Sequence, residues 1–274
     1  MRLLVTGAAG MLGRDVVAAA ESAGHDVTGL ARRDLDIADP GAVGAAVRAA
    51  RPDAVVNCAA WTDVDGAETH EADATLINAT GAGLIAAAAP YVVQVSTDYV
   101  FDGRASVPYA EDDPVGPHTA YGRSKLAGEL AVVAHGDHAI VRSAWLFGLH
   151  GRNFVATVLR LAEDRDEVRV VDDQIGCPTF TGHLAPALVD IAEQRLTGAL
   201  HVAGGGWCSW YELACATFEE AGVDCRVVPV TTAEFPRPAE RPPWSVLRST
   251  RPDAPSLPPW RDGLSAYLRS EVLR

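Results

Sequence analysis

The chain has 274 residues, enough for one large α/β domain or for a large domain with a small partner. Its 36 acidic residues against 23 basic ones give a net charge of −13, which repels a phosphate backbone and argues against nucleic acid as a partner. The five cysteines include no Cys-x-x-Cys pair and no spacing typical of zinc ligands, so we expect reduced thiols. No stretch has the length and apolar content of a membrane span or a signal peptide, and we therefore expect a cytoplasmic protein without membrane contact.

Strands and helices are predicted to alternate along the first half of the chain. The apolar pattern predicts strands at 3–5, 25–30, 54–57, 91–95 and 139–141, and helices at 11–23, 40–50, 71–88 and 121–134. A loop rich in proline and acidic residues, 104–118, precedes the last of these helices. This alternation predicts an α/β fold with a doubly wound parallel sheet of the Rossmann type.

The second half of the chain has a different character. Helices are predicted at 154–164 and 181–194, strands at 168–171 and 200–203, and turns at 172–179. After Trp207 we expect only short elements between prolines. We predict that residues 1–150 form the NAD(P)-binding domain, with part of 165–203 returning to it. Residues 151–274 are then mainly a smaller, discontinuous α/β substrate domain.

A glycine-rich turn follows the first predicted strand and opens the first predicted helix. Gly7, Gly10 and Gly13 have the spacing Gly-x-x-Gly-x-x-Gly in the strand–turn–helix context of a dinucleotide site. Glycines let the backbone approach a pyrophosphate, and the helix N-terminus offers free N–H groups. The alternative role of these glycines is to form a tight turn and to let the helix pack closely. The residues expected to bind the cofactor here are Gly7, Gly10, Met11 and Leu12.

The second strand ends in Arg32 and Arg33, where an NAD site usually carries an acidic residue. Two guanidinium groups suit a 2′-phosphate, which favours NADPH, with NADH as the alternative cofactor. Solvated loop charges are the other interpretation of these arginines. The turn at Asp36 and Ile37 is expected to meet the adenine. The small residues Ala59 and Ala60, after the third strand, are expected to let the backbone pass close to the cofactor.

Three residues have the chemistry of a carbonyl reductase. Tyr121 and Lys125 are four residues apart on a predicted helix, so their side chains share one face. An ammonium beside a phenol, whose ordinary pKa is about 10, lowers that pKa and allows proton exchange with a carbonyl oxygen. Thr97 ends the fourth strand, where chemistry gathers in open α/β sheets. Taken alone, the Tyr121–Lys125 pair is better explained as a chance spacing of exposed side chains, and Thr97 as a hydroxyl bonded to nearby backbone.

Together these segments resemble the extended short-chain dehydrogenase/reductases, and within them the dTDP-4-dehydrorhamnose reductase family. The resemblance runs nearly end to end. The residues that carry it are Asn57-Cys58-Ala59-Ala60, Thr62 to Glu68, Ser96 to Gly103, Tyr121 to Glu129, Arg142 to Trp145, Asn153-Phe154, Asp173 to Thr179, and Arg241-Pro242 followed by Ser245, and among them the block Ser96 to Phe101 is specific.

The resemblance implies reduction of the C4 ketone of dTDP-4-dehydro-6-deoxy-L-mannose to dTDP-L-rhamnose by a reduced nicotinamide. It implies that Tyr121 donates the proton, that Lys125 lowers the pKa of Tyr121 and holds the nicotinamide ribose, and that Thr97 orients the keto oxygen. The residues that it places against the nucleotide-sugar are Thr62, Val64, Thr97, Asp98, Trp145, Asn153 and Arg241. Alternatively, Trp145 is an aromatic residue of the hydrophobic core.

The resemblance also bears on metal binding and on rival functions. Some members dimerise through magnesium, and Asp15 matches one of its ligands, but the later acidic pair is missing where His183 to Pro186 stand. We therefore expect no metal, and a monomer or weak homodimer. A dTDP-sugar dehydratase would carry an acidic pair where Asp98 is followed by Tyr99. Reduction of a related dTDP-4-keto-6-deoxysugar and a non-catalytic dinucleotide-binding regulatory subunit are the remaining alternatives.

Overall fold

Within residues 1–272, which the computed structural model describes, the centre of the molecule is a six-stranded parallel sheet. Its strand order is β10-β5-β4-β3-β1-β2. The strands are β1 (Arg2–Thr6), β2 (Asp26–Leu30), β3 (Ala54–Asn57), β4 (Val92–Thr97), β5 (His138–Ser143) and β10 (Gly198–His201). The chain runs outward from β1 to β2 and returns to β3 on the other side of β1, which creates a switch point between β1 and β3. The predicted doubly wound sheet is confirmed.

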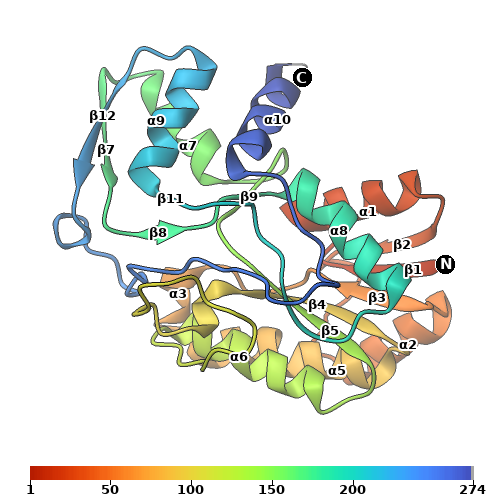
Figure 1. Cartoon of the computed structure of the whole chain (residues 1–274). Coiled ribbons are helices and arrows are strands. Elements are labelled where there is room, and N and C mark those ends of the chain that lie inside the picture. Colours follow the sequence, from red (N-terminus) through yellow and green to blue (C-terminus); the bar gives the residue numbers. More distant parts are fainter. Residues whose placement is uncertain (273–274) are drawn as a thin grey trace.

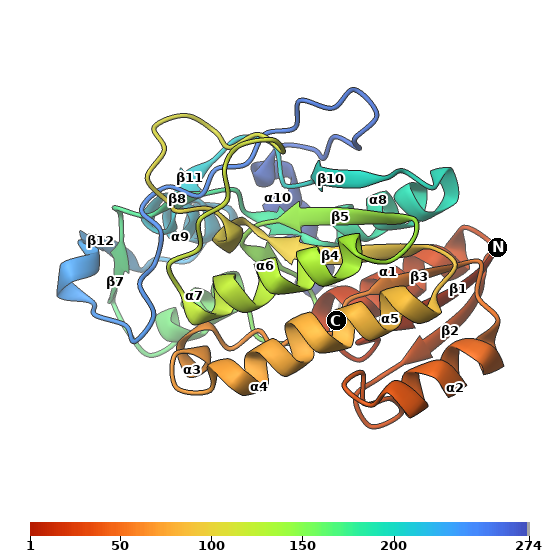
Figure 2. The same cartoon turned by 90° about the horizontal axis from the view of Figure 1, so that it is seen from below.

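Helices cover both faces of the sheet (Figures 1 and 2). Helices α1 (Met11–Ser22) and α8 (Thr181–Gln194) pack on one face, and α2 (Pro40–Ala50), α5 (Ala82–Ala88) and α6 (Ala120–Val133) pack on the other. Successive strand residues point to opposite faces, so Leu3 and Val5 join the first layer while Leu4 joins the second. Burial on both faces explains why these strands are continuously apolar.

The helix predicted over 71–88 is interrupted. It consists of α4 (Glu71–Thr75), the π-helix η1 (Leu76–Gly81) and α5, and a short helix α3 (Val64–Ala67) precedes it. The wider π turn directs Asn78 inward, where its amide bonds the backbone N–H and C=O of Trp61 and the hydroxyl of Ser124. The sequence pattern does not reveal this insertion, because its partners lie far along the chain.

A second region lies above the sheet in Figure 1. It contains α7 (Phe154–Ala162), α9 (Trp210–Ala221) and α10 (Trp260–Val272), and the paired strands β7 (Glu167–Val171) and β12 (Arg226–Val230). The short strands β6 (Leu146–Phe147), β8 (Ile175–Gly176), β9 (Thr179–Phe180) and β11 (Cys208–Ser209) form two further two-stranded pairs, β6 with β9 and β8 with β11. Between 165 and 203, α8 and β10 join the central layers, whereas β7 does not.

The expectation of only short elements after Trp207 was wrong, because α9 has 12 residues and α10 has 13. Helix α9 begins with a capping box between Ser209 and Glu212 and ends at Gly222, whose φ is 65°. Both signals are legible in the sequence. Within 1–272 no helix combines the length and the apolar content needed to cross a bilayer.

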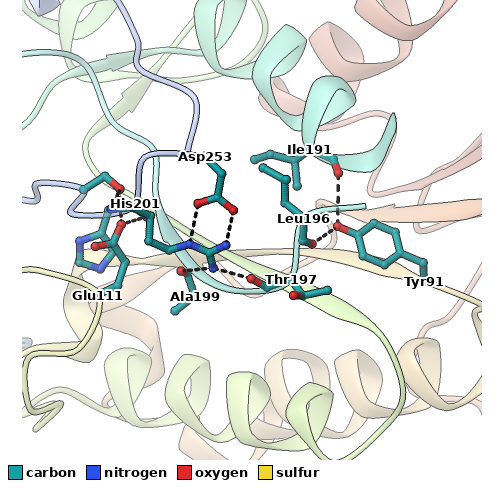
Figure 3. A network of polar contacts seen from close by, with 10 residues as sticks. Tyr91, Glu111, Ile191, Leu196, Thr197, Ala199, His201 and Asp253 are labelled. Carbon is teal, nitrogen blue, oxygen red and sulfur yellow. Dashed lines mark hydrogen bonds and ion pairs between the residues drawn. The ribbon is translucent and has the colours of Figure 1, made fainter. Parts of the chain in front are cut away.

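Polar contacts fasten the segment after β12 back onto the sheet (Figure 3). Glu111, in the loop before α6, accepts hydrogen bonds from the backbone N–H groups of His201 and Thr250, at 3.1 and 2.9 Å, and from the hydroxyl of Ser249. Burial alone would raise the pKa of Glu111, but these hydrogen bonds outweigh it and lower the pKa to about 2. The loop, the edge strand β10 and the C-terminal segment are therefore held together by one ionised carboxylate.

Candidate active site

The glycine turn leaves the N-terminus of α1 open. No side chain caps this helix, so the first N–H groups remain available to a phosphate. A Cβ on Gly13 would lie 2.2 Å from the carbonyl oxygen of Gly7, so α1 packs directly on the turn. Gly7 itself has a φ of 67°. Met11 and Leu12 follow at the start of α1, and because the Leu12 side chain is in the core, only its backbone faces this site.

The residues after β2 separate into exposed cations and a buried anchor. Arg32 and Arg33 are exposed, and the Nε atom of Arg33 lies 3.5 Å from Asp34. Asp36 is exposed and accepts the N–H of Ala38, whereas the Ile37 side chain is buried in the core layer of α2 and α5. Both guanidinium groups are thus accessible to a 2′-phosphate, although that of Arg33 is paired with Asp34, and Ile37 is restricted to a backbone contact.

The turn after β3 lies against the glycine turn at the switch point. A Cβ on Gly7 would come within 2.7 Å of the backbone nitrogen of Ala59. The side chain of Asn57 accepts the Thr6 hydroxyl at 2.6 Å and the Ala59 N–H at 3.1 Å, which fixes the two turns to each other. Ala59 and Ala60 are half-buried. This arrangement matches the expected backbone wall of a dinucleotide site.

Thr97, Tyr121 and Lys125 meet at the end of β4. Tyr121 lies in the first turn of α6, close enough to Thr97 for the Thr97 hydroxyl to influence the pKa of its phenol. The Thr97 hydroxyl donates to Asp98 at 2.9 Å. Lys125 is buried, and its Nζ donates to the carbonyl oxygen of Val95 at 2.7 Å. The structure thus brings Tyr121 close to Thr97 and fixes Lys125 to the same strand, two residues before Thr97.

The pKa of the Tyr121 phenol is raised above its ordinary value, first by burial and then by the charge of Asp98, and the nearby Thr97 hydroxyl offsets this only in part. The expectation that Lys125 lowers the pKa of Tyr121 is wrong for this structure. The ammonium of Lys125 is engaged with a backbone carbonyl, and its own pKa is lowered to about 8, mainly by burial. A phenol with a raised pKa is protonated at neutral pH, which is the form that a proton donor needs.

Trp145 is held in an unusual backbone conformation beside this group. Its φ is 48°, in the left-handed region that side chains other than glycine seldom adopt. Its ring stacks on Trp210 with a centroid distance of 3.5 Å. A Cβ on Gly176 would lie 2.4 Å from the same ring, so only glycine fits there. Backbone strain of this kind often marks a functional position, and it separates Trp145 from an ordinary core aromatic.

The other residues predicted to bind substrate differ in their exposure and in whether their side chains are already hydrogen-bonded. Asp98 is buried, whereas Thr62 is exposed and Val64 half-buried near α3. Asn153 caps α7: its Oδ1 accepts the N–H of Ala156, and its Nδ2 donates to the carbonyl of Gly148, both at 2.9 Å. In this structure Asn153 is therefore a helix cap, a role that its place before an apolar helix also predicts.

Arg241 belongs to a proline-rich segment, residues 236–243, that we call the strap. Its Nη1 lies 3.0 Å from Oδ1 of Asp65, and the N–H of Ala239 donates to the same oxygen at 3.1 Å. Glu68, on the turn after α3, also binds backbone: it accepts the N–H of Ala120 at the start of α6. A cavity lies under the strap, lined by Tyr99, Phe101, Asp102, Arg104, His118, Thr119, Glu240, Pro242 and Pro243.

Asp15, matched above to a magnesium ligand, has a different neighbour here. Its Oδ1 lies 3.6 Å from Nε2 of His150. Within 1–272 no group of three or more His, Cys, Asp or Glu side chains has the arrangement of a metal site.

Two residues of the site were missed from the sequence. Trp210 forms the stack with Trp145, and the Ser209–Glu212 capping box was the available signal that it starts a helix. Tyr99 packs edge-on against Tyr121 with a centroid distance of 5.6 Å. It follows Asp98 directly, so its place in the site could have been inferred from the strand end.

Comparison with known proteins agrees with this geometry. Residues 1–272 match the family described as the RmlD substrate binding domain. A dTDP-4-dehydrorhamnose reductase from Streptomyces griseus is 46% identical over 98% of this chain and 92% of its own. A dTDP-4-keto-6-deoxy-D-glucose reductase from Streptomyces niveus is also 46% identical, over 90% of this chain and 88% of its own.

Among solved structures, dTDP-4-dehydrorhamnose reductase from Bacillus anthracis in complex with NADP superposes with a TM-score of 0.95. It is 36% identical in sequence, and the match covers 98% of this chain and 99% of that one. The fold, the glycine turn, the Thr97–Tyr121–Lys125 group and these relatives lead to one assignment: the chain belongs to the dTDP-4-dehydrorhamnose reductase family.

Proposed function

We infer that the protein reduces the C4 ketone of dTDP-4-dehydro-6-deoxy-L-mannose to dTDP-L-rhamnose with NADPH. The observation that carries this inference is the proximity of Thr97 and Tyr121 at the end of β4, at the same end of the parallel sheet as the open N-terminus of α1 and the two arginines after β2. Reduction of a ketone needs a hydrogen-bond donor and a proton for the oxygen that forms. Both are present on adjacent elements.

NADPH fits the residues of the first half of the chain. The free N–H groups of α1 would bind the pyrophosphate, Arg32 and Arg33 the 2′-phosphate, and Ala59 and Ala60 would line the nicotinamide side. When bound, this cofactor supplies the hydride. We propose that residues 1–150 with α8 and β10 bind the cofactor, and that the region containing α7, α9 and α10 contributes the substrate side.

The chain's own residues would handle the proton. Tyr121, kept protonated by its raised pKa, would donate to the keto oxygen, and the Thr97 hydroxyl would orient that oxygen. Lys125, whose Nζ is held by the carbonyl oxygen of Val95, would hold the nicotinamide ribose. Trp145 and Arg241 would bind the nucleotide-sugar from the other side.

The rival functions are less well supported. The ring of Tyr99 follows Asp98, so the second carboxylate that a dehydratase requires is missing at that position. A regulatory subunit would not need the assembled Thr97, Tyr121 and Lys125. Reduction of a related dTDP-4-keto-6-deoxysugar remains a second candidate, supported by the relative from Streptomyces niveus.

The test is NADPH oxidation against a panel of dTDP-4-keto-6-deoxyhexoses, with Tyr121→Phe as the diagnostic variant. We expect the rhamnose precursor to be the best substrate. Tyr121→Phe should keep the wild-type Kd for NADPH and lose at least a hundredfold in kcat, because only the proton donor is removed. Near wild-type turnover of this variant would refute the assignment.

Cofactor preference is tested separately. The double substitution Arg32→Ala and Arg33→Ala should raise the KM for NADPH at least tenfold, since a charge-assisted contact to the 2′-phosphate is lost. The KM for NADH, which lacks this phosphate, should change less than twofold. Equal effects on both cofactors would show that these arginines are only surface charges.

A further inference from the structure

A buried ion pair lies one helical turn beyond Lys125 on α6. Glu129 and Arg142 are 5% and 6% exposed. The Nη2 of Arg142 donates to Oε2 of Glu129 at 2.7 Å, and its Nε donates to Oε1 at 3.0 Å. The Ser96 hydroxyl also donates to Oε1, at 2.5 Å. Both oxygens of this carboxylate are therefore occupied, by side chains from two neighbouring strands.

These contacts fix α6 to the strand that carries Thr97. Ser96 of β4 and Arg142 of β5 stand opposite each other in the sheet. Lys125 and Glu129 lie four residues apart on one face of α6. They bond to Val95 and Ser96, two successive residues of β4 that directly precede Thr97. Two turns of the helix are thus attached to the end of the strand, immediately beside the reacting groups.

We propose that Glu129 is a positioning residue for the reduction: through Ser96 and Arg142 it sets where α6 presents Tyr121 and Lys125 against Thr97. This inference rests on the proposed function. Glu129 touches neither Tyr121 nor Thr97 directly, so it acts by fixing the position of α6 relative to β4 and β5. Small displacements of reacting groups change rates strongly, which makes kcat the sensitive quantity.

Within residues 1–272, the other groups in contact with the Arg142 guanidinium carry no negative charge that could replace that of Glu129. The Nη1 of Arg142 lies 3.3 Å from the carbonyl oxygen of Glu111 and 3.5 Å from Nε2 of His201, and its guanidinium lies over the Phe101 ring. His201 Nδ1 lies close to the carbonyls of Tyr109 and Arg248, so Nδ1 carries the proton and Nε2 faces Arg142 unprotonated. Glu111 and His201 lie together in Figure 3.

Among the described residues, Glu129 is the carboxylate that neutralises Arg142. Burial lowers the pKa of His201, so no further cation arises there at neutral pH. A neutral residue in place of Glu129 would leave a buried guanidinium without its counter-charge.

Glu129 also acts on the charge of Lys125. Burial is the larger influence and lowers the pKa of Lys125 to about 8, while Glu129 on the same helix and Cys58 after β3 oppose it. Burial raises the pKa of Cys58 to about 12, so its thiol is neutral and Glu129 is the carboxylate that matters at neutral pH. Removal of the Glu129 charge therefore lowers the pKa of Lys125 further. If kcat falls at alkaline pH because Lys125 loses its proton, this fall should then begin at a lower pH.

The experiment measures NADPH oxidation by the full chain with the dTDP-4-keto-6-deoxyhexose that the wild type reduces, from pH 6 to 10, beside thermal melting. The variants are Glu129→Gln, the double variant Glu129→Met with Arg142→Met, and the control Glu71→Gln. Replacement of a buried ion pair by apolar residues of similar size is often tolerated, so the double variant should fold even where the single one does not. Glu71 pairs with Arg123 of α6 on the exposed side, and its loss should leave kcat unchanged.

We expect Glu129→Gln to lose at least tenfold in kcat, with the KM of the sugar within threefold of wild type and the alkaline limb about half a pH unit lower or more. The double variant should regain the melting temperature but not kcat. A wild-type kcat and alkaline limb in Glu129→Gln, or recovery of both stability and kcat in the double variant, would overturn the proposal. A wild-type protein that fails to oxidise NADPH with any sugar would instead refute the proposed function.

Discussion

Asp98 shows how the site holds a charge at the expense of stability. Its carboxyl group is buried beside Thr97, and burial raises its pKa from 3.8 to about 6, against hydrogen bonds that favour the ionised form. At neutral pH the group is mostly ionised in the folded protein. A carboxylate buried without a cationic partner is unfavourable, and such costs are typical of functional positions rather than of the core.

The stability of the protein should therefore fall as Asp98 ionises. Because the folded pKa lies above the unfolded one, the favourable contribution of this group is complete below pH 3.8 and is lost as the pH rises through about 6. Asp98→Asn should raise the free energy of unfolding at pH 7.5, by up to about 3 kcal/mol from a shift of about 2 pKa units. Below pH 4 it should have little effect. Urea denaturation at both pH values measures the difference.

Asp102 provides a control of opposite sign. The Tyr109 hydroxyl donates to it at 2.6 Å, and this bond, followed by that from the Arg104 N–H, lowers its pKa. The contribution of Asp102 to stability is present above its ordinary pKa of 3.8 and is lost as the pH falls through its lower pKa in the folded protein. Asp102→Asn should therefore destabilise the protein at pH 7.5, and this effect should diminish as the pH falls into the acidic range. The same sign for both variants would contradict this account of Asp98.

At the scale of elements, the sequence predicted what local patterns determine. The strands of the central sheet and α1, α2, α6 and α8 follow from continuous apolar runs, glycine punctuation and helical periodicity. The π turn at Leu76–Gly81 could not be predicted, because it is stabilised by Asn78 bonds to Trp61 and Ser124, residues distant in sequence. The same holds for the stack of Trp145 on Trp210.

The candidate site divides in the same way. Its residue types and their positions at strand ends could be inferred, as for Thr97 and Tyr121. The sign of the pKa shift of Tyr121 could not, because it depends on burial and on Asp98 rather than on the Lys125 spacing. A pattern specifies which groups share a face, whereas their electrostatics depend on the packed surroundings.

The packing of α6 on the π turn gives an element-scale prediction. A Cβ on Gly128 would lie 2.0 Å from the backbone oxygen of Asn78, so Gly128→Ala forces the two helices apart. We expect a loss of about 2 kcal/mol or more in the free energy of unfolding, by analogy with overpacked cores, and a reduced kcat because α6 carries Tyr121. Thermal melting and NADPH oxidation measure the two effects.

Gly44→Ala on α2 is the matched control. The nearest atoms to its added Cβ belong to the flexible end of Arg48, at 3.0 Å, so the neighbour can move. Alanine has the higher helix propensity by about 1 kcal/mol, and this variant should be neutral or slightly more stable. If both alanine variants behave alike, the close contact between α6 and the π turn is not the cause.

At the scale of the molecule, the strap connects the second region to the sheet across the site. After β12 the chain passes through residues 236–243, is tethered to Asp65 near α3, and then pairs with the loop before α6 through Tyr109 and Leu247. Burial would raise the pKa of Asp65, but the bonds from Ala239 and Arg241 outweigh it and lower the pKa. The tether should therefore persist throughout the neutral range and be lost only in acid.

Asp65→Ala should release the strap without unfolding the protein. The N–H of Ala239 loses its acceptor, so we expect its hydrogen exchange to accelerate at least tenfold, while the N–H groups of Tyr109 and Arg248, bonded to backbone beyond the strap, keep their rates. The KM of the nucleotide-sugar should rise several-fold, because Arg241 is no longer held over the site, and the KM of NADPH should stay within twofold. Unchanged exchange at Ala239 would show that Asp65 does not hold the strap. Faster exchange at all three amides would mean that the substitution loosens the whole C-terminal half. A local effect of Asp65 on the strap would leave the backbone hydrogen bonds of Tyr109 and Arg248 intact.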